Sequence, residues 1–502
     1  MKAPGGRPRW LPISLTVFSA VVWGVSLVWS VAQHPLWEDE AYNLTVVRNL
    51  VNGLGYSSDG ILRFGTLTPF DPAISTGPVV LLPAAGLHAF GIPLVLSGRL
   101  VTAAFAVLLA VAAYTLGARC ERLALGSVRA PRPSIAGALA SMLPLTFDTW
   151  LTLSPIQGPA DVLGEFAAAA LLLWAVCALP RRPWLAGLLV GLAIQTKLIA
   201  LLAIPALVVA LLWAVPGWRR RVREVFVAGA GVVLPTVFYE AWILIALGPS
   251  GFHSNLRDQY WFLRSHTADY SQPNTPGQKL ELFSRAWMLP SAAAVAVGLC
   301  LLGLLVLLLV SADRQTAVTS RRSLNAVVVC GLIGAGTFVL WWVFSSRTPL
   351  WVRHPAIGML AFVPAIGAGT FGLLSAGGWR RAAPVRWLVG GLGAIVVVAV
   401  LCQTGAYGWA QISGTSQTSA TSLSRQRADA AELRRGLQTL PSAREWVAVP
   451  WGGSVSMAVL ADRHVRLVTQ ASAARTPRLM PAGGCSPAVA SAGGYVVCSA
   501  SR

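Results

Sequence analysis

Three consecutive acidic residues, Glu38, Asp39 and Glu40, follow the first long apolar stretch of the chain. A carboxylate held close to a hydroxyl group can accept its proton and act as a general base. The same residues could instead form a solvated loop that only helps to set the topology of the chain. Residues 41–58 then have the pattern of a short amphipathic helix that ends at glycine. The acidic run therefore marks either a reactive site or a loop before a surface helix.

A second pair of acids, Asp161 and Glu165, follows the sequence SPIQGPA. A spacing of four residues places both on one face of a helix, and ionisable groups inside an apolar segment are costly and usually functional. Asp161 could also cap the start of that helix, where a carboxylate suits the helix dipole. Glu165 lies one turn deeper, where capping explains it less well. For Asp148 and Glu240, which also fall in apolar runs, we expect structural hydrogen bonds.

Basic residues predicted to lie on the same side as these acids complete the set of candidates. Lys197 closes the sequence GLAIQTK, where it could bind a phosphate as a point charge or extend to the membrane interface. Arg347, Arg353 and His354 crowd the short segment SSRTPLWVRHP, which either anchors the chain at the interface or binds an anion. Arg63 is a candidate of the same kind. Such a site suits a substrate with a lipid tail and a phosphate head.

The elements that must position these residues are apolar. Of the 502 residues, 55% are hydrophobic and 12% are charged, whereas soluble domains carry about 25% charged residues. Several apolar runs reach the roughly 20 residues that cross a bilayer, and backbone groups in lipid must pair internally, as they do in helices. We therefore predict an all-α polytopic membrane protein. The net charge of +20 does not indicate nucleic-acid binding, because the charges lie in short clusters between apolar runs.

About eleven transmembrane helices are predicted. We expect them at residues 11–33, 93–117, 134–153, 161–180, 184–198, 200–216, 225–247, 286–310, 324–344, 355–376 and 387–409. The first is longer than the apolar region of a signal peptide and is expected to stay uncleaved. The apolar segment 77–92 is not counted, because Pro78, Pro83 and Gly91 interrupt it. We predict that this segment lies in the interface as an external juxtamembrane segment.

The positions of Lys and Arg residues predict the orientation of the chain. With the N-terminus in the cytoplasm, the cytoplasmic segments hold 19 Lys and Arg residues, and the three longest external loops hold 8 over a greater length. If residues 77–92 crossed the membrane, the basic cluster in residues 118–133 would face outwards. The sequence therefore predicts a multi-pass protein of the plasma (inner) membrane, with a cytoplasmic N-terminus and an external C-terminus.

Three parts are expected along the chain. Residues 1–409 form the transmembrane module, residues 410–424 form a Ser/Thr/Gly-rich linker, and residues 425–502 form a small external α/β domain. Its pattern predicts helices at 427–439 and 453–461, with short extended segments on either side of the second.

The polar tail contains two cysteines, Cys485 and Cys498. They are either two free thiols or a disulfide, which can persist outside the cytoplasm. The residues between them include Gly493-Gly494, which could form a turn joining two extended segments. We expect the disulfide.

The motifs resemble, in the same order, those of GT-C class membrane glycosyltransferases, in particular the protein O-mannosyltransferase and aminoarabinose transferase-like enzymes (glycosyltransferase family 39-like). WEDEAYNLTVVRNL resembles their DEA-containing first external loop, PADVLGEF their second acidic site, and LAGLLVGLAIQTKLIALLAIP their GLxxGLAxxTK stretch. The interrupted segment 77–92, followed by Gly98-Arg99, matches their entry to the second helix. The resemblance covers residues 30–215, and the rest of the chain is similar only in layout.

The resemblance implies inverting transfer of a sugar from a polyprenyl-phosphate donor to a lipid, glycan or protein acceptor on the outer face. Asp39 matches the principal catalytic carboxylate of the family, and Glu40 completes its motif. Asp161 matches the second acid and Lys197 the lysine near the donor phosphate. Pro159-Ala160 stands where the family often has an Arg or a small polar residue. This departure bears on the role that the resemblance implies for Asp161, and it does not bear on the role of Asp39.

The remaining candidates, Glu165, Arg63, Arg347, Arg353 and His354, are assigned to substrate binding. We find no glycine-rich nucleotide loop and no metal-ligand spacing, so we expect neither a cofactor nor a metal. A transporter or lipid flippase would also place acids and bases within helices. Transporters often show paired repeats, whereas the polar groups here concentrate in the first half and in one late loop. A non-catalytic membrane scaffold is the third alternative.

Overall fold

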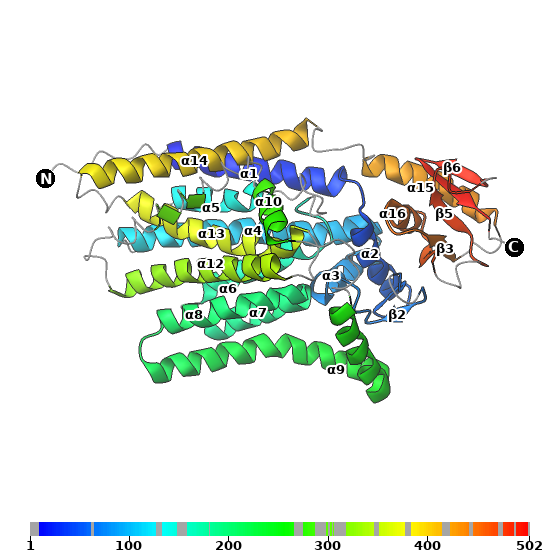
Figure 1. Cartoon of the computed structure of the whole chain (residues 1–502), viewed down its shortest axis with the longest axis horizontal. Coiled ribbons are helices and arrows are strands. Elements are labelled where there is room, and N and C mark those ends of the chain that lie inside the picture. Colours follow the sequence, from blue (N-terminus) through cyan, green and yellow to red (C-terminus); the bar gives the residue numbers. More distant parts are fainter. Residues whose placement is uncertain are drawn as a thin grey trace.

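Long apolar helices run side by side along the molecule, and a small sheet lies beyond one end of them (Figure 1). The computed structural model describes residues 10–61, 65–126, 133–147, 158–179, 181–265, 275–286, 298–299, 302–303, 305, 318–345, 351–376, 383–413, 422–440, 445–469, 475–485 and 488–499. We call the end that carries the sheet the sheet end, and the other end, where α1 begins and α4 finishes, the far end.

Six helices of the described residues are long and apolar enough to cross a membrane. They are α1 (Trp10–Ala32), α4 (Leu94–Leu125), α9 (Trp218–Ser265), α12 (Val318–Phe344), α13 (Arg353–Ala376) and α14 (Ala383–Ile412). Helix α13 is the most enclosed of the six: 89% of its apolar window is buried inside the protein. The chain is therefore a multi-pass membrane protein, as predicted.

Shorter apolar helices fill the spaces between the long ones. They are α3 (Pro78–Ala89), α5 (Ile135–Met142) continued by η1 (Leu143–Thr146), α6 (Glu165–Ala178), α7 (Pro183–Thr196), and α8 (Ile204–Ala214) preceded by η2 (Leu198–Ala203). Every predicted span overlaps helical residues; most of the span 286–310 lies outside the described residues, and residues 298–299, 302–303 and 305 within it are helical. The count of eleven spans is not confirmed, because α5, α6, α7 and α8 are shorter than a bilayer requires.

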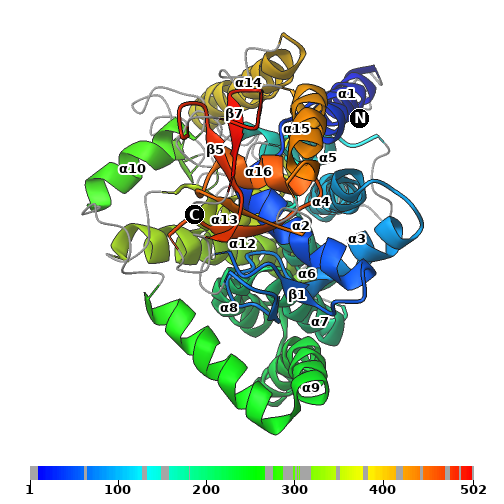
Figure 2. The same ribbon diagram turned by 90° about the vertical axis from the view of Figure 1, so that its right-hand side faces the viewer.

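Helix α3 lies at the sheet end beside α2 (Glu38–Val51), and it does not run along the bundle (Figures 1 and 2). Its 12 residues cover about 18 Å at 1.5 Å per residue, well short of a hydrocarbon core of about 30 Å. This position supports the interfacial placement predicted for residues 77–92.

Two features of α9 shape one side of the bundle. Helix α7 packs closely on α9 at Gly187. A Cβ atom at this position would lie 1.9 Å from the carbonyl oxygen of Ala228 in α9, so only glycine fits there. Small residues allow this close approach between membrane helices. Gly248 then has a positive φ of 68° and is followed by Pro249, so the helix kinks there. The second half of α9 turns across the sheet end (Figure 1). Helix α10 (Pro276–Arg285) follows in the chain and lies near the end of α12, where Lys279 donates to the Trp342 and Ser345 carbonyls.

The C-terminal unit contains α15 (Leu423–Gln438), α16 (Gly453–Leu460) and a five-stranded sheet of order β4-β3-β5-β7-β6. The strands are β3 (Trp446–Val449), β4 (His464–Leu467), β5 (Arg478–Pro481), β6 (Ala490–Ala492) and β7 (Tyr495–Cys498). Strand β3 pairs in parallel with β4 and β5, and β7 pairs antiparallel with β5 and β6. The helices and extended segments predicted around residue 453 are confirmed.

The predicted disulfide between Cys485 and Cys498 is present, with a Cα–Cα distance of 6.1 Å. Gly493 and Gly494 both have positive φ and form the two-residue turn between β6 and β7, the backbone that tight hairpins require. The hairpin predicted from the two glycines is therefore confirmed.

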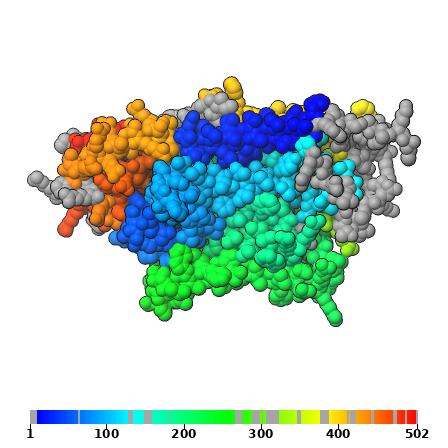
Figure 3. Space-filling view, turned by 180° about the vertical axis from the view of Figure 1, so that it is seen from behind, coloured from blue at the N-terminus to red at the C-terminus, as the bar shows by residue number. Residues whose placement is uncertain are grey.

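One hydrophobic cluster joins the C-terminal unit to the membrane bundle. It runs from Leu44 and Val47 of α2 through Val80 of α3 to Val447 and Val465 of the sheet. In the space-filling view, the orange residues of the C-terminal unit lie directly against the blue α2–α3 segment (Figure 3). The sheet is thus packed onto the segment that carries the acidic run. A two-residue ladder, β1 (Ser57–Ser58) with β2 (Thr68–Pro69), completes this segment.

Candidate active site

Asp39 lies in the first turn of α2 and forms an ion pair with Arg353, the first residue of α13. Their side chains keep 18% and 10% of their surface exposed, so the pair remains in contact with solvent. The Arg353 guanidinium also lies 4.4 Å from the centre of the Trp351 ring, a cation–π contact that restricts its movement. Because α13 is the most enclosed helix, Arg353 is held on a rigid support.

A second ion pair joins Lys197 and Glu165, and the Lys197 ammonium also donates to the Leu163 carbonyl at 2.8 Å. Lys197 has extended backbone angles at the break between α7 and η2, and its side chain reaches the residues at the start of α6. Its side chain is 16% exposed, whereas that of Glu165 is 1% exposed. Glu165 therefore anchors the lysine from inside, and part of the Lys197 side chain remains exposed.

The two ion pairs belong to one cluster. Both Arg353 and Asp39 act electrostatically on the Lys197 ammonium, so the second pair lies within interaction range of the first. We call Asp39, Arg353, Lys197 and Glu165 the charged cluster. It holds two carboxylates and two cations at the sheet end, drawn from α2, α13, α6 and the α7–η2 break.

Glu40 points the other way from Asp39, into the protein. Its carboxylate receives two hydrogen bonds from Arg99 of α4, from Nε at 2.8 Å and Nη2 at 2.7 Å. The remaining Arg99 N–H groups donate to the carbonyl oxygens of Ser30, His34 and Pro35. Both side chains are fully buried. This bidentate pair ties the start of α2 and the end of α1 to the second turn of α4.

Asp161 lies in a turn before α6 and is also buried. One carboxylate oxygen lies 3.2 Å from His34 Nδ1 and accepts from Ser30, and the other accepts from the Gly158 amide at 3.0 Å. The expectation that Asp161 caps the helix, or shares a helical face with Glu165, is wrong. Gly164, with a φ of +83°, is the N-cap, and helical geometry begins only at Glu165.

Glu38 lies beside the charged cluster and has an altered acidity. Burial, and secondarily the adjacent Asp39 carboxylate, raise the pKa of Glu38 to about 7. Its charge in turn helps to raise the pKa of Tyr495 on β7, after burial. Tyr495 therefore brings the C-terminal sheet close to the cluster, a neighbour that the sequence did not predict.

A polar network that the sequence did not predict fixes the C-terminal unit to this region. The buried Asp59 carboxylate accepts from Arg48 of α2 at 2.8 Å and from the Val465 amide at 3.0 Å, and it lies 2.8 Å from His464 Nδ1. Arg48 also donates to the Arg463 carbonyl. The only signal in the sequence was the scarcity of acids, since the chain contains 19 Asp and Glu residues in total.

The other predicted candidates are placed as follows. The His354 ring stacks on Trp351 at 5.9 Å, next to Arg353. Arg63, Arg347 and Asp148 lie outside the described residues. Oε2 of Glu240 in α9 is buried without a hydrogen-bond partner in the part of the chain that the structure describes, so the hydrogen bond expected for Glu240 is not found at this atom.

The sequence and the fold were compared with those of known proteins. No protein-family model matches the chain, and no curated protein matches it in sequence. Among solved structures, it is similar to ArnT from Cupriavidus metallidurans, with undecaprenyl phosphate bound (TM-score 0.59) and in the apo state (TM-score 0.60). In both cases the identity is 14%, and 97% of each chain is covered.

A further similar structure is the archaeal oligosaccharyltransferase AglB from Archaeoglobus fulgidus, in complex with an inhibitory peptide and a dolichol-phosphate. Here the TM-score is 0.49 and the identity 10%, over 91% of this chain and 64% of that one. The similarity to the two ArnT structures shows that the chain has their polytopic fold, and the resemblance to the GT-C class predicted from the sequence is confirmed for the fold.

Proposed function

We propose that the chain is an inverting glycosyltransferase that moves a sugar from a polyprenyl-phosphate donor to an acceptor on the outer face of the plasma membrane. The observation that carries this proposal is the charged cluster. It places a partly exposed carboxylate beside two cations at one end of an apolar bundle. The bundle has the fold of a protein whose structure holds undecaprenyl phosphate.

In the proposed reaction, an acceptor hydroxyl attacks the anomeric carbon of the donor sugar. The bond from that carbon to the phosphate oxygen breaks, and the polyprenyl phosphate leaves with the bonding electrons. Asp39 accepts the proton of the hydroxyl, because its carboxylate is partly exposed and lies beside both cations, whereas Glu40 is buried. Lys197 and Arg353 stabilise the negative charge that develops on the leaving phosphate.

Glu40 and Asp161, predicted from the resemblance to be catalytic, are proposed to position the site. Each is buried, and its oxygens are occupied by partners inside the protein. Glu40 holds α2 against Arg99 and so fixes Asp39 one residue earlier. Glu165 holds Lys197 in the same way. His354, Arg347 and Arg63 remain proposed contacts of the donor.

The orientation and the eleven spans also remain proposals. The described arginines of the clusters predicted to be cytoplasmic, among them Arg119, Arg181 and Arg219, lie on the elements at the far end of the bundle (Figure 1), which supports a single-sided distribution. We further propose the division into residues 1–409, 410–424 and 425–502. The C-terminal unit would then cover the outer side of the site.

Cysteine-accessibility labelling in intact cells tests the orientation. Cysteines introduced near residues 125, 220 and 318 should be protected from a membrane-impermeant reagent. Cysteines near residues 60, 265 and 430 should react. Labelling of residue 125 from outside would show that residues 77–92 cross the membrane and would invert the proposed topology from that point.

Incubation of the purified protein with radiolabelled polyprenyl-phosphate sugars and cell-envelope acceptors tests the activity. An enzyme transfers the label to acceptor and releases polyprenyl phosphate. A flippase moves intact donor across a proteoliposome membrane and leaves its sugar attached, and that result would contradict the proposal.

A further inference from the structure

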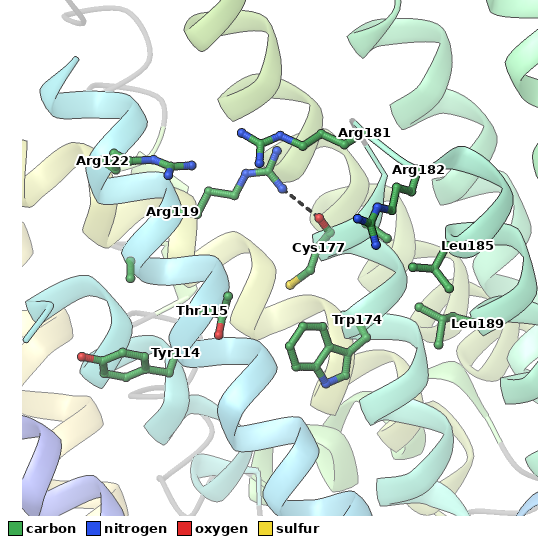
Figure 4. A pocket seen from close by; sticks show the side chains of 12 residues that line it. Tyr114, Thr115, Arg119, Arg122, Trp174, Cys177, Arg181, Arg182, Leu185 and Leu189 are labelled. Carbon is green, nitrogen blue, oxygen red and sulfur yellow. Dashed lines mark hydrogen bonds between the residues drawn. The ribbon is translucent and has the colours of Figure 1, made fainter. Parts of the chain in front are cut away.

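A cavity of about 490 Å³ opens at the far end of the bundle, between α4, α6 and α7. Four arginines line it: Arg119 and Arg122 from the last turns of α4, and Arg181 and Arg182 from the turn between α6 and α7. In Figure 4 they occupy the upper part of the view, with the guanidinium groups directed toward the space between the helices. We call these four residues the arginine pocket.

The arginine pocket has no acidic counterpart. No Asp or Glu lines the cavity, and within the described ranges none of the four arginines forms an ion pair. Arg181 and Arg122 act unfavourably on the charge of Arg119. Like charges gathered at a partly enclosed site repel one another, and a bound anion relieves that repulsion.

Arg119 is already oriented for such an anion. It is half-buried, and one Nη1–H donates to the Cys177 carbonyl of α6 at 2.8 Å, which holds the guanidinium in place. Its Nε is buried without a hydrogen-bond partner among the residues that the structure describes. A buried donor without an acceptor is costly, and a phosphate oxygen is an acceptor that suits arginine.

The remainder of the cavity is apolar. Trp174, Leu185 and Leu189 line it below the arginines (Figure 4), on the side that faces the middle of the bundle. The cavity therefore combines cations at the membrane surface with an apolar wall running into the bilayer. This is the arrangement that an anionic phospholipid fits, with its phosphate at the arginines and its acyl chains along the wall.

We propose that the arginine pocket is a binding site for the phosphate group of an anionic phospholipid, separate from the charged cluster at the other end. The ordinary role of arginines at this end, setting the orientation of the chain, needs only exposed charge. It explains neither the fixed guanidinium of Arg119 nor its buried Nε. A free phosphate ion shares the same head-group chemistry and lacks the acyl chains that the apolar wall would contact.

Native mass spectrometry of the purified protein, titrated with phosphatidylglycerol in detergent, tests the proposal. The double variant Arg119→Gln/Arg181→Gln should bind phosphatidylglycerol about thirtyfold more weakly, from the usual contribution of an arginine at a membrane surface. The matched control is Arg219→Gln/Arg223→Gln, which removes two exposed charges at the start of α9. The control should bind as the wild type does, and millimolar inorganic phosphate should not displace the lipid.

Three results would overturn the proposal. Equal retention of lipid by both double variants would show that the pocket does not bind it. Equal loss in both would show that only the total charge matters. Displacement of phosphatidylglycerol by millimolar inorganic phosphate would show that the site recognises a free anion and not a lipid. Thermal unfolding of each variant in the same detergent establishes that the comparison is between folded proteins.

Discussion

The two ends of the bundle carry their charges in opposite ways. At the sheet end three buried or partly buried cations have carboxylate partners: Arg353 with Asp39, Lys197 with Glu165 and Arg99 with Glu40. At the far end, the four arginines of the arginine pocket have no acidic partner in the described ranges. An unpaired charge inside a protein costs several kcal/mol, whereas one at the surface is hydrated.

This difference separates two uses of charge. Paired charges in the interior fix the geometry of a site, because each partner defines where the other must lie. Unpaired charges at a surface are available to a ligand or to the membrane. The charged cluster combines both uses, since its pairs are partly exposed and a phosphate can compete for Lys197 and Arg353.

The largest effect is expected from leaving one interior charge at the sheet end without its partner. Glu40→Gln keeps the shape of the side chain and removes the counter-charge of Arg99, so the free energy of unfolding should fall by about 3–5 kcal/mol. The control is Glu281→Gln, since Glu281 pairs with Arg285 and both are more than half exposed. Its loss should stay below about 1 kcal/mol. Denaturant unfolding in detergent measures both free energies. Equal losses of unfolding free energy in the two variants would show that a paired interior charge matters no more than a surface charge.

Removal of the Lys197 charge should weaken donor binding by about tenfold to hundredfold, because a charge-assisted hydrogen bond to phosphate is lost. Lys197→Met also leaves the buried Glu165 without its partner. The double variant Lys197→Met/Glu165→Gln removes both charges, and it should regain thermal stability without regaining donor binding. Titration with polyprenyl-phosphate sugar measures the binding.

Arg219→Gln removes one exposed positive charge at the far end, outside the arginine pocket, and is the matched control for Lys197→Met. Its donor affinity should equal that of the wild type. If both single variants lost donor affinity alike, the loss would reflect total charge and not a contact at the sheet end. That result would contradict the assignment of Lys197 to the donor phosphate.

The smallest effect is a pH dependence at Glu38. Its pKa is about 7 in the folded protein and about 4.3 in an unfolded chain. The folded state therefore holds this proton more tightly, and the stability that Glu38 contributes is full below the unfolded pKa and is lost as the pH rises through 7. Glu38→Gln imitates the protonated form. The melting temperature of the wild type should fall relative to the variant between about pH 5 and 8, and parallel curves would exclude the raised pKa.

The sequence identified Asp39, Glu165 and Lys197 as candidates because acids and lone cations are rare in apolar segments and their order resembles a known class. It could not identify their partners. Arg353 lies 314 positions from Asp39, and only the tertiary structure brings the start of α13 to the first turn of α2. Spacing along one helix is readable from a sequence, whereas contacts between distant helices depend on tertiary packing.

Local backbone features explain the remaining differences. The Gly493-Gly494 turn was predicted because two adjacent glycines favour the positive φ of a tight hairpin. Asp161 was placed on a helix because its neighbours are apolar, yet the positive φ of Gly164 delays the start of α6. The network around Asp59 and His464 joins residues 405 positions apart, and no pattern in the sequence indicates it.

Sugar transfer by Asp39→Asn tests the central claim most directly. The variant and the wild type are given the same radiolabelled polyprenyl-phosphate sugar and acceptor. The control Asp462→Asn removes a carboxylate of the C-terminal unit that is more than half exposed. If Asp39 is the general base, its variant should bind donor and stay monodisperse while its turnover falls about a hundredfold or more, and the control should keep full turnover. Turnover by Asp39→Asn close to that of the wild type would contradict the account.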